Sequence, residues 1–172
     1  MQFCMEYGDT NFIGVVNSEK YKSFVDSNWK LDGLMNHFTD EMKNGNILVF
    51  QMTKEGIEHS WKVEVTICEE LPEQKCYRKA YAYIKVTDNQ LFLVDYDCLT
   101  MAAQFAHHKV PNKNCSKYRI PIENGVYRVE IVQFYNVDRN EYVGSDEKEF
   151  IINFTKEDVF NDIVNKVFWC IF

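Results

Sequence analysis

Carboxylates gather in two stretches of the chain, and tyrosines lie close to both. The segment EELPE at residues 69–73 carries three glutamates, and the segment 138–149, DRNEYVGSDEKE, carries five carboxylates against two basic side chains. General acid–base catalysis needs two carboxylates that converge in a cleft with separated pKa values. The spacing shows no such convergence, so the simplest interpretation is solvated loop charge, and a surface for a basic partner is the alternative.

The histidines do not form a pattern that predicts a metal site. His107 and His108 are adjacent, and successive side chains on a strand point to opposite faces, so the two cannot bind one metal from a strand. His37 and His59 have no carboxylate or second histidine at a recognised ligand spacing. No metal or other cofactor is expected.

Six cysteines are scattered through the chain, and they are expected to be reduced and partly buried. Zinc sites need close pairs, whereas seven residues separate Cys68 from Cys76. Cys115, between Lys113 and Lys117, is the most plausible exposed thiol because the lysines would lower its pKa. With no orienting partner, no GxSxG turn and no Gly-rich phosphate loop, the chain is not expected to be an enzyme.

The elements that must position these residues are mostly strands. Alternating apolar residues predict three hairpins, which pair 46–53 with 60–68, 77–86 with 90–96, and the two halves of 118–136 around Asn124-Gly125. Segment 99–107 is compatible with either a helix or a strand. Segment 90–96 has apolar residues on both faces, as in a central strand.

Helical spacing appears early and at the end of the sequence. It predicts helices over 19–26 and 31–44, the second closed by Gly45, and a C-terminal helix that begins near Thr155. The apolar stripe of that last helix comprises Val159, Phe160, Ile163, Val164, Val167 and Phe168. The expected fold is mainly β, an antiparallel sandwich or open barrel of about seven or eight strands with these helices at its margins.

Composition and charge limit the class of protein. The 172 residues are 46% hydrophobic and 15% aromatic, which favours one compact domain over residues 1–172. The net charge of −7 disfavours nucleic acid and anionic membranes as partners. Glu6 and Asp9 stand where a secretory signal would be basic, and residues 167–172 are too short an apolar run to span a bilayer, so a soluble cytoplasmic protein is expected.

The order of elements carries a resemblance to a known family. Trp29, the segment TDEMKNGN at 39–46, VTDNQLFL at 86–93 and IPIENGVYRVEIVQFYN at 120–136 resemble the bacterial nuclease inhibitors of the competence-protein-J type. Small β-sandwich immunity proteins are similar too. The resemblance covers residues 28–137 and implies a cytosolic acidic protein that blocks a toxin or nuclease without catalysis. The segment from Asn140 extends beyond that smaller family, so no binding residue is carried over.

The leading hypothesis is a non-catalytic immunity-type inhibitor that neutralises a bacterial toxin, most plausibly a nuclease, through acidic and aromatic loops. Tyr81, Tyr83, Tyr135 and Tyr142 are expected to be exposed beside those loops. A small-ligand-binding domain with an aromatic pocket is the alternative, and it would show a deep cavity where an inhibitor shows a filled core. The sequence leaves the oligomeric state open. The predicted contact residues are Glu69, Glu70, Glu73, Asp138, Glu141, Tyr142, Asp146 and Glu147.

Overall fold

The computed structural model describes residues 1–6, 8–67 and 70–172, and within these ranges the chain forms eleven strands and two helices. One sheet has the order β1-β4-β11-β8-β5, a second has the order β3-β2-β6-β7, and β9 pairs with β10. The elements are β1 (Gln2–Met5), β2 (Phe12–Val16), α1 (Leu31–Lys43), β3 (Ile47–Gln51), β4 (Trp61–Ile67), β5 (Arg78–Val86), β6 (Gln90–Asp95), α2 (Tyr96–Gln104), β7 (Arg119–Pro121), β8 (Gly125–Gln133), β9 (Tyr135–Asn136), β10 (Glu141–Tyr142) and β11 (Phe150–Glu157).

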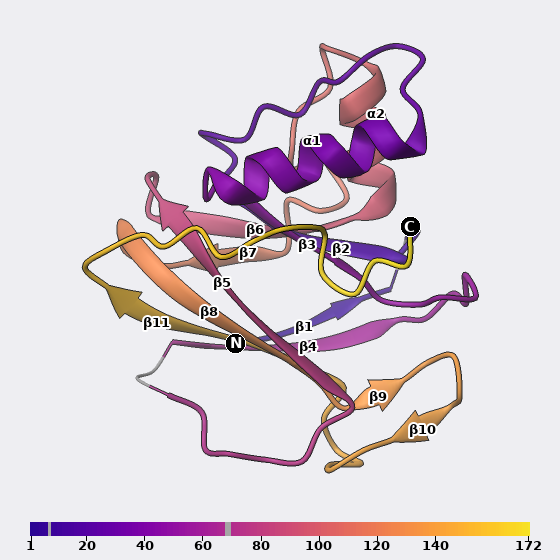
Figure 1. Ribbon diagram of the computed structural model, residues 1–172, viewed down its shortest axis with the longest axis vertical. Coiled ribbons are helices and arrows are strands. Elements are labelled where there is room, and N and C mark those ends of the chain that lie inside the picture. Colours follow the sequence, from indigo (N-terminus) through magenta and orange to yellow (C-terminus); the bar gives the residue numbers. More distant parts are fainter. Residues whose placement is uncertain (7, 68–69) are drawn as a thin grey trace.

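The molecule is layered, with the four-stranded sheet between the helices and the five-stranded sheet (Figure 1). Strands β2 and β3 are buried along their whole length because α1 and α2 cover one face and the other sheet covers the other. Strand β4 instead alternates between buried and more exposed residues, as expected for a sheet with one solvated face. The mainly β fold is therefore confirmed, and the sheets do not close into a barrel.

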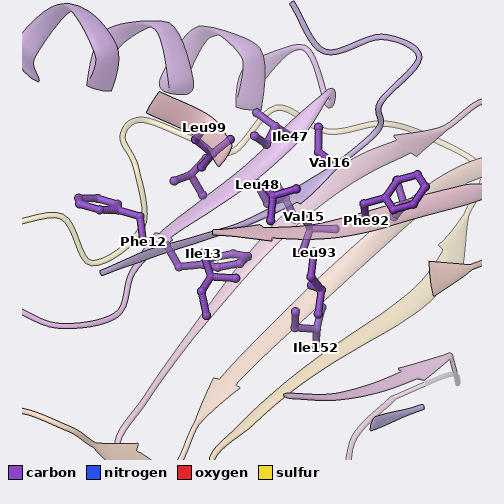
Figure 2. Packing of buried hydrophobic residues seen from close by; sticks show 14 of the residues in the cluster. Phe12, Ile13, Val15, Val16, Ile47, Leu48, Phe92, Leu93, Leu99 and Ile152 are labelled. Carbon is purple, nitrogen blue, oxygen red and sulfur yellow. The ribbon is translucent and has the colours of Figure 1, made fainter. Parts of the chain in front are cut away.

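The core lies between the two sheets and extends under the helices. Figure 2 shows Val15 and Leu93 from the four-stranded sheet above Ile152 from β11, with Leu99 of α2 on the opposite side of the same sheet. All four side chains are fully buried. The expectation that 90–96 supplies a central strand is confirmed, because β6 lies between β2 and β7.

The three predicted hairpins are wrong in the same way. Each predicted pair splits between the sheets, so that β3, β6 and β7 lie in one sheet and β4, β5 and β8 lie in the other. The turns themselves occur where they were expected. Each turn carries the chain from one sheet to the other. Strand pairing depends on which residues far apart in sequence are buried together, and neither alternation nor turn residues encode that information.

Two of these crossovers are tied to each other at one end of the sandwich. The Asn124 side-chain oxygen accepts a hydrogen bond from the Asn89 backbone N at 2.6 Å, and the Asn89 side-chain oxygen accepts one from the Asn124 N at 3.2 Å.

One strand pair also departs from the antiparallel expectation, because β4 and β11 run parallel.

Of the predicted helices, the one over 31–44 is confirmed as α1, and the ambiguous segment 99–107 falls partly within helix α2. The helix predicted over 19–26 is wrong, since that segment has no helical structure. Its backbone bonds elsewhere: the Lys22 N donates to the Glu41 carboxylate and the Val25 N to the Ala103 carbonyl. These contacts replace the bonds that a helix would have made.

The predicted C-terminal helix is also wrong. Thr155, the expected N-cap, lies inside β11, and residues 158–172 form a largely extended segment, called here the C-terminal strap. The Phe168 N donates to the Val49 carbonyl and the Gln51 N donates to the Phe168 carbonyl, so the strap pairs with the outer edge of β3. Backbone pairing with an unoccupied strand edge therefore prevails over the helical spacing of the apolar residues.

Arg78 links β5 to β3 beside the strap through its side-chain hydrogen bonds. Its side chain donates to the Gln133 side-chain oxygen and to the Gln51 carbonyl, both at 2.7 Å. Its guanidinium carbon lies 4.1 Å from the centre of the Trp169 ring in the strap. Burial lowers the pKa of Arg78 to about 10, so the side chain remains charged at neutral pH. The strap and Arg78 together close this side of the sandwich.

Two further expectations concern the state of the cysteines and the presence of a membrane-spanning segment. Cys4, Cys76, Cys98, Cys115 and Cys170 are free thiols, and Cys68 lies outside the described residues. In the described ranges, no helix is long and apolar enough to cross a lipid bilayer.

Candidate functional site

The two predicted acidic loops lie side by side, although about 70 residues separate them in sequence. They occupy the lower end of Figure 1, where the segment after β4 runs beside the β9–β10 hairpin. Gly144 adopts a φ of +86°, and a Cβ built there would lie 1.7 Å from the Lys75 carbonyl oxygen, so the two backbones touch. Beneath them, Leu71 and Cys76 pack against a buried cluster of Val132, Phe134 and Ile151. This end, formed by residues 70–77 and 137–149, is called the acidic end.

The predicted contact residues do not share one kind of position. Glu73, Glu141, Tyr142, Asp146 and Glu147 are exposed at the acidic end. Glu70 is exposed as well, and its carboxylate pairs with Arg128 at 2.8 Å on the outer face of the five-stranded sheet. Glu69 lies outside the described residues.

Asp138 differs from the others because its carboxylate holds a neighbouring loop. It accepts hydrogen bonds from the Thr53 hydroxyl and from the backbone N of Lys54 and Glu55. Burial alone would raise the pKa of Asp138, but these hydrogen bonds and the Arg78 charge outweigh it and lower the pKa. Asp138 therefore shapes the site from beneath, and its direct contact with a partner stays a prediction.

Four aromatic rings form a continuous series from the core to the surface of the acidic end. The ring centres of Trp61 and His59 are 4.7 Å apart, those of His59 and Tyr135 are 4.8 Å apart, and those of Tyr135 and Tyr142 are 4.6 Å apart. Trp61 is 1% exposed and Tyr142 is 41% exposed. This ring series therefore holds Tyr142 on a buried support, which limits the motion of the exposed ring.

Glu149 holds two members of the ring series. One oxygen accepts from the Lys62 backbone N at 2.9 Å and lies 3.2 Å from His59 Nε2, and the other accepts from the Tyr142 hydroxyl at 3.2 Å. Burial would raise the pKa of Glu149, but the bonds from His59, Lys62 and Tyr142 together lower it. The carboxylate therefore stays charged and fixes the orientation of the exposed ring.

The sequence did not indicate this support. His59 and Glu149 are 90 residues apart, and neither stands at a spacing that marks a pair. Tyr135 was expected to be exposed but is 8% exposed, because it lies inside the ring series. Tyr81 and Tyr142 are exposed as expected, and Tyr83 is half-buried. The alternation of His59 with Trp61 was the one available signal, and it specified a strand face only.

The sequence also raised Cys115 as a reactive thiol and the question of metal ligands. Cys115 is fully buried rather than exposed, and a hydrogen bond with Cys98 and burial raise its pKa. The lysines beside it are exposed, and the Lys117 ammonium lies over the Tyr118 ring. Over residues 1–6, 8–67 and 70–172, no group of three histidine, cysteine or carboxylate side chains is arranged to hold a metal ion.

Several hollows lie on the outside of the molecule. A groove of about 490 Å³ crosses β1, β4 and the start of β11, and its lining includes Cys4, Lys62 and Glu147. A second, of about 460 Å³, lies between α1 and the strap. Neither opens between the two sheets, where large apolar side chains such as Phe50, Phe150 and Phe154 are completely buried.

Comparison with solved structures finds the same fold in proteins of very different sequence. The chain titled "Crocagin biosynthetic gene J" matches with a TM-score of 0.58 at 12% identity, over 91% of this chain and 95% of that one. ComJ from Bacillus subtilis, titled an inhibitor of the DNA degrading activity of NucA, matches with a TM-score of 0.50 at 10% identity, over 91% and 94%. No family model and no curated protein matches the sequence significantly. The likeness shows a shared fold.

Proposed function

We propose that this chain is a non-catalytic inhibitor that binds a cationic protein, a nuclease or nuclease-like toxin, through its acidic end. The observation that carries the proposal is the convergence of two acidic loops around Tyr142, an exposed ring held from below by Tyr135 and Glu149. The fold shared with ComJ, whose title names it an inhibitor of a DNA-degrading activity, supports the same class.

The chemistry of the acidic end suits such a partner. Nuclease active sites are cationic because they bind phosphate, and carboxylates offer complementary charge that steers the encounter. Tyrosine is among the residues that dominate interface energies, because it buries a large area at low entropic cost. The filled core favours this function over a small-ligand pocket between the sheets.

The test compares two variants that remove the same charge. Glu141→Gln, Asp146→Asn and Glu147→Gln neutralise the acidic end, whereas Glu19→Gln, Asp32→Asn and Asp40→Asn neutralise three exposed carboxylates on and beside α1. Wild-type protein and both variants are immobilised and exposed to lysate of the native host. Any nuclease captured is then purified, and its DNA cleavage is measured with and without each protein.

Wild-type protein and the α1 variant should capture the nuclease and stop its cleavage, and raising the salt concentration should weaken both effects. The acidic-end variant should lose most of the inhibition. If no nuclease is retained, or if the captured nuclease stays fully active, the proposed function is wrong. Equal inhibition by the two variants would place the contact surface elsewhere.

A further inference from the structure

Two buried thiols lie in one side-chain cluster beneath the start of α2. Cys98, in the first turn of that helix, is 1% exposed, and Cys115, in the turn 113–117, is fully buried. Asn112 joins them, because its backbone N donates to the Cys98 Sγ at 3.3 Å and its side-chain oxygen accepts from the Cys115 N at 2.9 Å. Asn112 therefore holds the Cys98 sulfur and the Cys115 backbone in one buried cluster.

The two thiols are not equivalent. The interaction between the two thiols lowers the pKa of Cys98 and raises the pKa of Cys115. The backbone N of Asn112 and the position in the first helical turn also favour negative charge on Cys98. Cys98 therefore has the character of the attacking sulfur, and Cys115 that of the protonated partner.

A buried carboxyl group stands beside the pair. Asp95, the N-cap of α2, is 2% exposed, and one of its oxygens accepts from the Cys98 N at 2.8 Å. The Cys115 thiol is within hydrogen-bonding reach of the same carboxylate. Burial, with Asp97 and Asp9 nearby, raises the pKa of Asp95, so this group is suited to take a proton from a neighbouring thiol.

We propose that Cys98 and Cys115 form a reversible redox pair that a small peroxide converts into a disulfide, with Asp95 accepting the proton of Cys115. The Cys98 thiolate attacks one peroxide oxygen, the O–O bond breaks, and a sulfenic acid forms while the departing hydroxide takes up the proton that Cys98 lost on ionisation and leaves as water. The Cys115 sulfur then displaces the sulfenic oxygen as a second water while its proton leaves through Asp95. In total, two thiols and one hydrogen peroxide give one disulfide and two waters.

The cover over the pair is thin on one side. Lys113, Asn114, Ser116 and Lys117 are all exposed, so a single surface turn separates Cys115 from solvent. Local opening of such a turn requires far less free energy than global unfolding. Hydrogen peroxide is close to water in size, so we expect it to reach the pair through such local opening without disruption of the core.

The test treats the full chain with hydrogen peroxide, then alkylates free thiols in denaturant and maps the peptides by mass spectrometry. A peptide pair joined through Cys98 and Cys115, lighter by two hydrogen atoms and released by dithiothreitol, is the expected result. The variant Cys4→Ser/Cys76→Ser, which removes the two most exposed of the described thiols, should form the same link at the same rate. Asp95→Asn keeps a good helix cap and should slow the link by at least about tenfold.

Two results would overturn the proposal. The first is Cys98 and Cys115 both remaining alkylated at a peroxide concentration that has already oxidised Cys4. The second is stable oxidation of Cys98 to the sulfinic acid without a link. Equal rates in wild-type protein and Asp95→Asn would remove the role of Asp95. The peptide map of the wild-type protein decides the first question even if a variant fails to fold.

Discussion

In two regions of this molecule, aromatic rings pack beside a charged side chain. In one region the chain covers the charged group, and in the other the rings lead to the surface. Beside the strap, the guanidinium of Arg78 packs on Trp169 and donates to the Gln51 carbonyl, and the C-terminal segment covers the group. At the acidic end, Glu149 accepts from Tyr142, and the ring series finishes at a side chain that is 41% exposed.

The difference separates residues that close the fold from residues that present a surface. The donors of Arg78 are directed at acceptors on two other strands, β3 and β8, and on Met52 just after β3, so its loss should affect folding first. Glu149 orients a ring that leads out of the protein, so its loss should affect the shape of the surface as well as folding. Four substitutions test this contrast, ordered by their expected effect on stability.

Arg78→Ala should have the largest effect, lowering the free energy of unfolding by about 3 kcal/mol because buried acceptors on Gln51, Met52 and Gln133 lose their donor. Urea denaturation measures this change. Lys79→Ala, which truncates the exposed neighbour, is the control and should leave the midpoint unchanged. A wild-type midpoint for Arg78→Ala would mean that the strap closes the sandwich without it.

Gly144→Ala should cost about 2 kcal/mol, since the added methyl meets the Lys75 carbonyl and the backbone is in the left-handed region. Gly56→Ala is the matched control, with a φ of +71° but no atom within 4 Å of the new Cβ. Thermal unfolding of both separates the clash from backbone strain. Equal losses in the two variants would show that the loops of the acidic end are not packed together.

Glu149→Gln should lower stability at neutral pH by about 1 to 2 kcal/mol through weaker bonds to His59 and the Lys62 N. The folded pKa of Glu149 is depressed, so its contribution is complete above the unfolded value of about 4.3 and is lost as the pH falls through the folded pKa. Denaturation between pH 3 and pH 7 should therefore give a shallower acid loss for the variant than for Glu147→Gln. Parallel curves would contradict this.

Tyr142→Ala should change stability by less than about 1 kcal/mol, because the ring is partly exposed and packs mainly on Tyr135. Its affinity for the captured nuclease should fall by more than tenfold, as for a central aromatic anchor. Tyr142→Phe keeps the ring and should retain most of the affinity. A large stability loss with unchanged affinity would assign the ring to the fold instead.

The parts of the structure that could be predicted from the sequence are those that local spacing encodes. The apolar stripe of α1 and the buried character of β6 follow from which faces must leave water. The strap could not be predicted, because Val164 and Val167 are buried as expected but in an extended segment whose backbone pairs with β3. Periodicity identifies the residues that will be buried. It does not identify the backbone conformation of their segment or the strand with which that segment pairs.

In the candidate site, too, some features follow from the local sequence and others do not. The exposed carboxylates at Glu141, Asp146 and Glu147 were visible as a composition shift in one loop. The hydrogen bond between His59 and Glu149 depends on β11 returning beside β4 in parallel, a pairing that no local pattern specifies. The surface was therefore predictable and its support was not.

The three crossovers between the sheets carry a consequence for how the chain folds. In the described residues β9 and β10 form the one tight hairpin, and the five-stranded sheet combines strands from Gln2 to Glu157. Most strand contacts thus join residues distant in sequence, a high contact order that places folding in the millisecond-to-second range. Because the chain crosses repeatedly between the sheets, we expect the two sheets to form together in slow, cooperative folding, with both gaining hydrogen-exchange protection in a single kinetic phase.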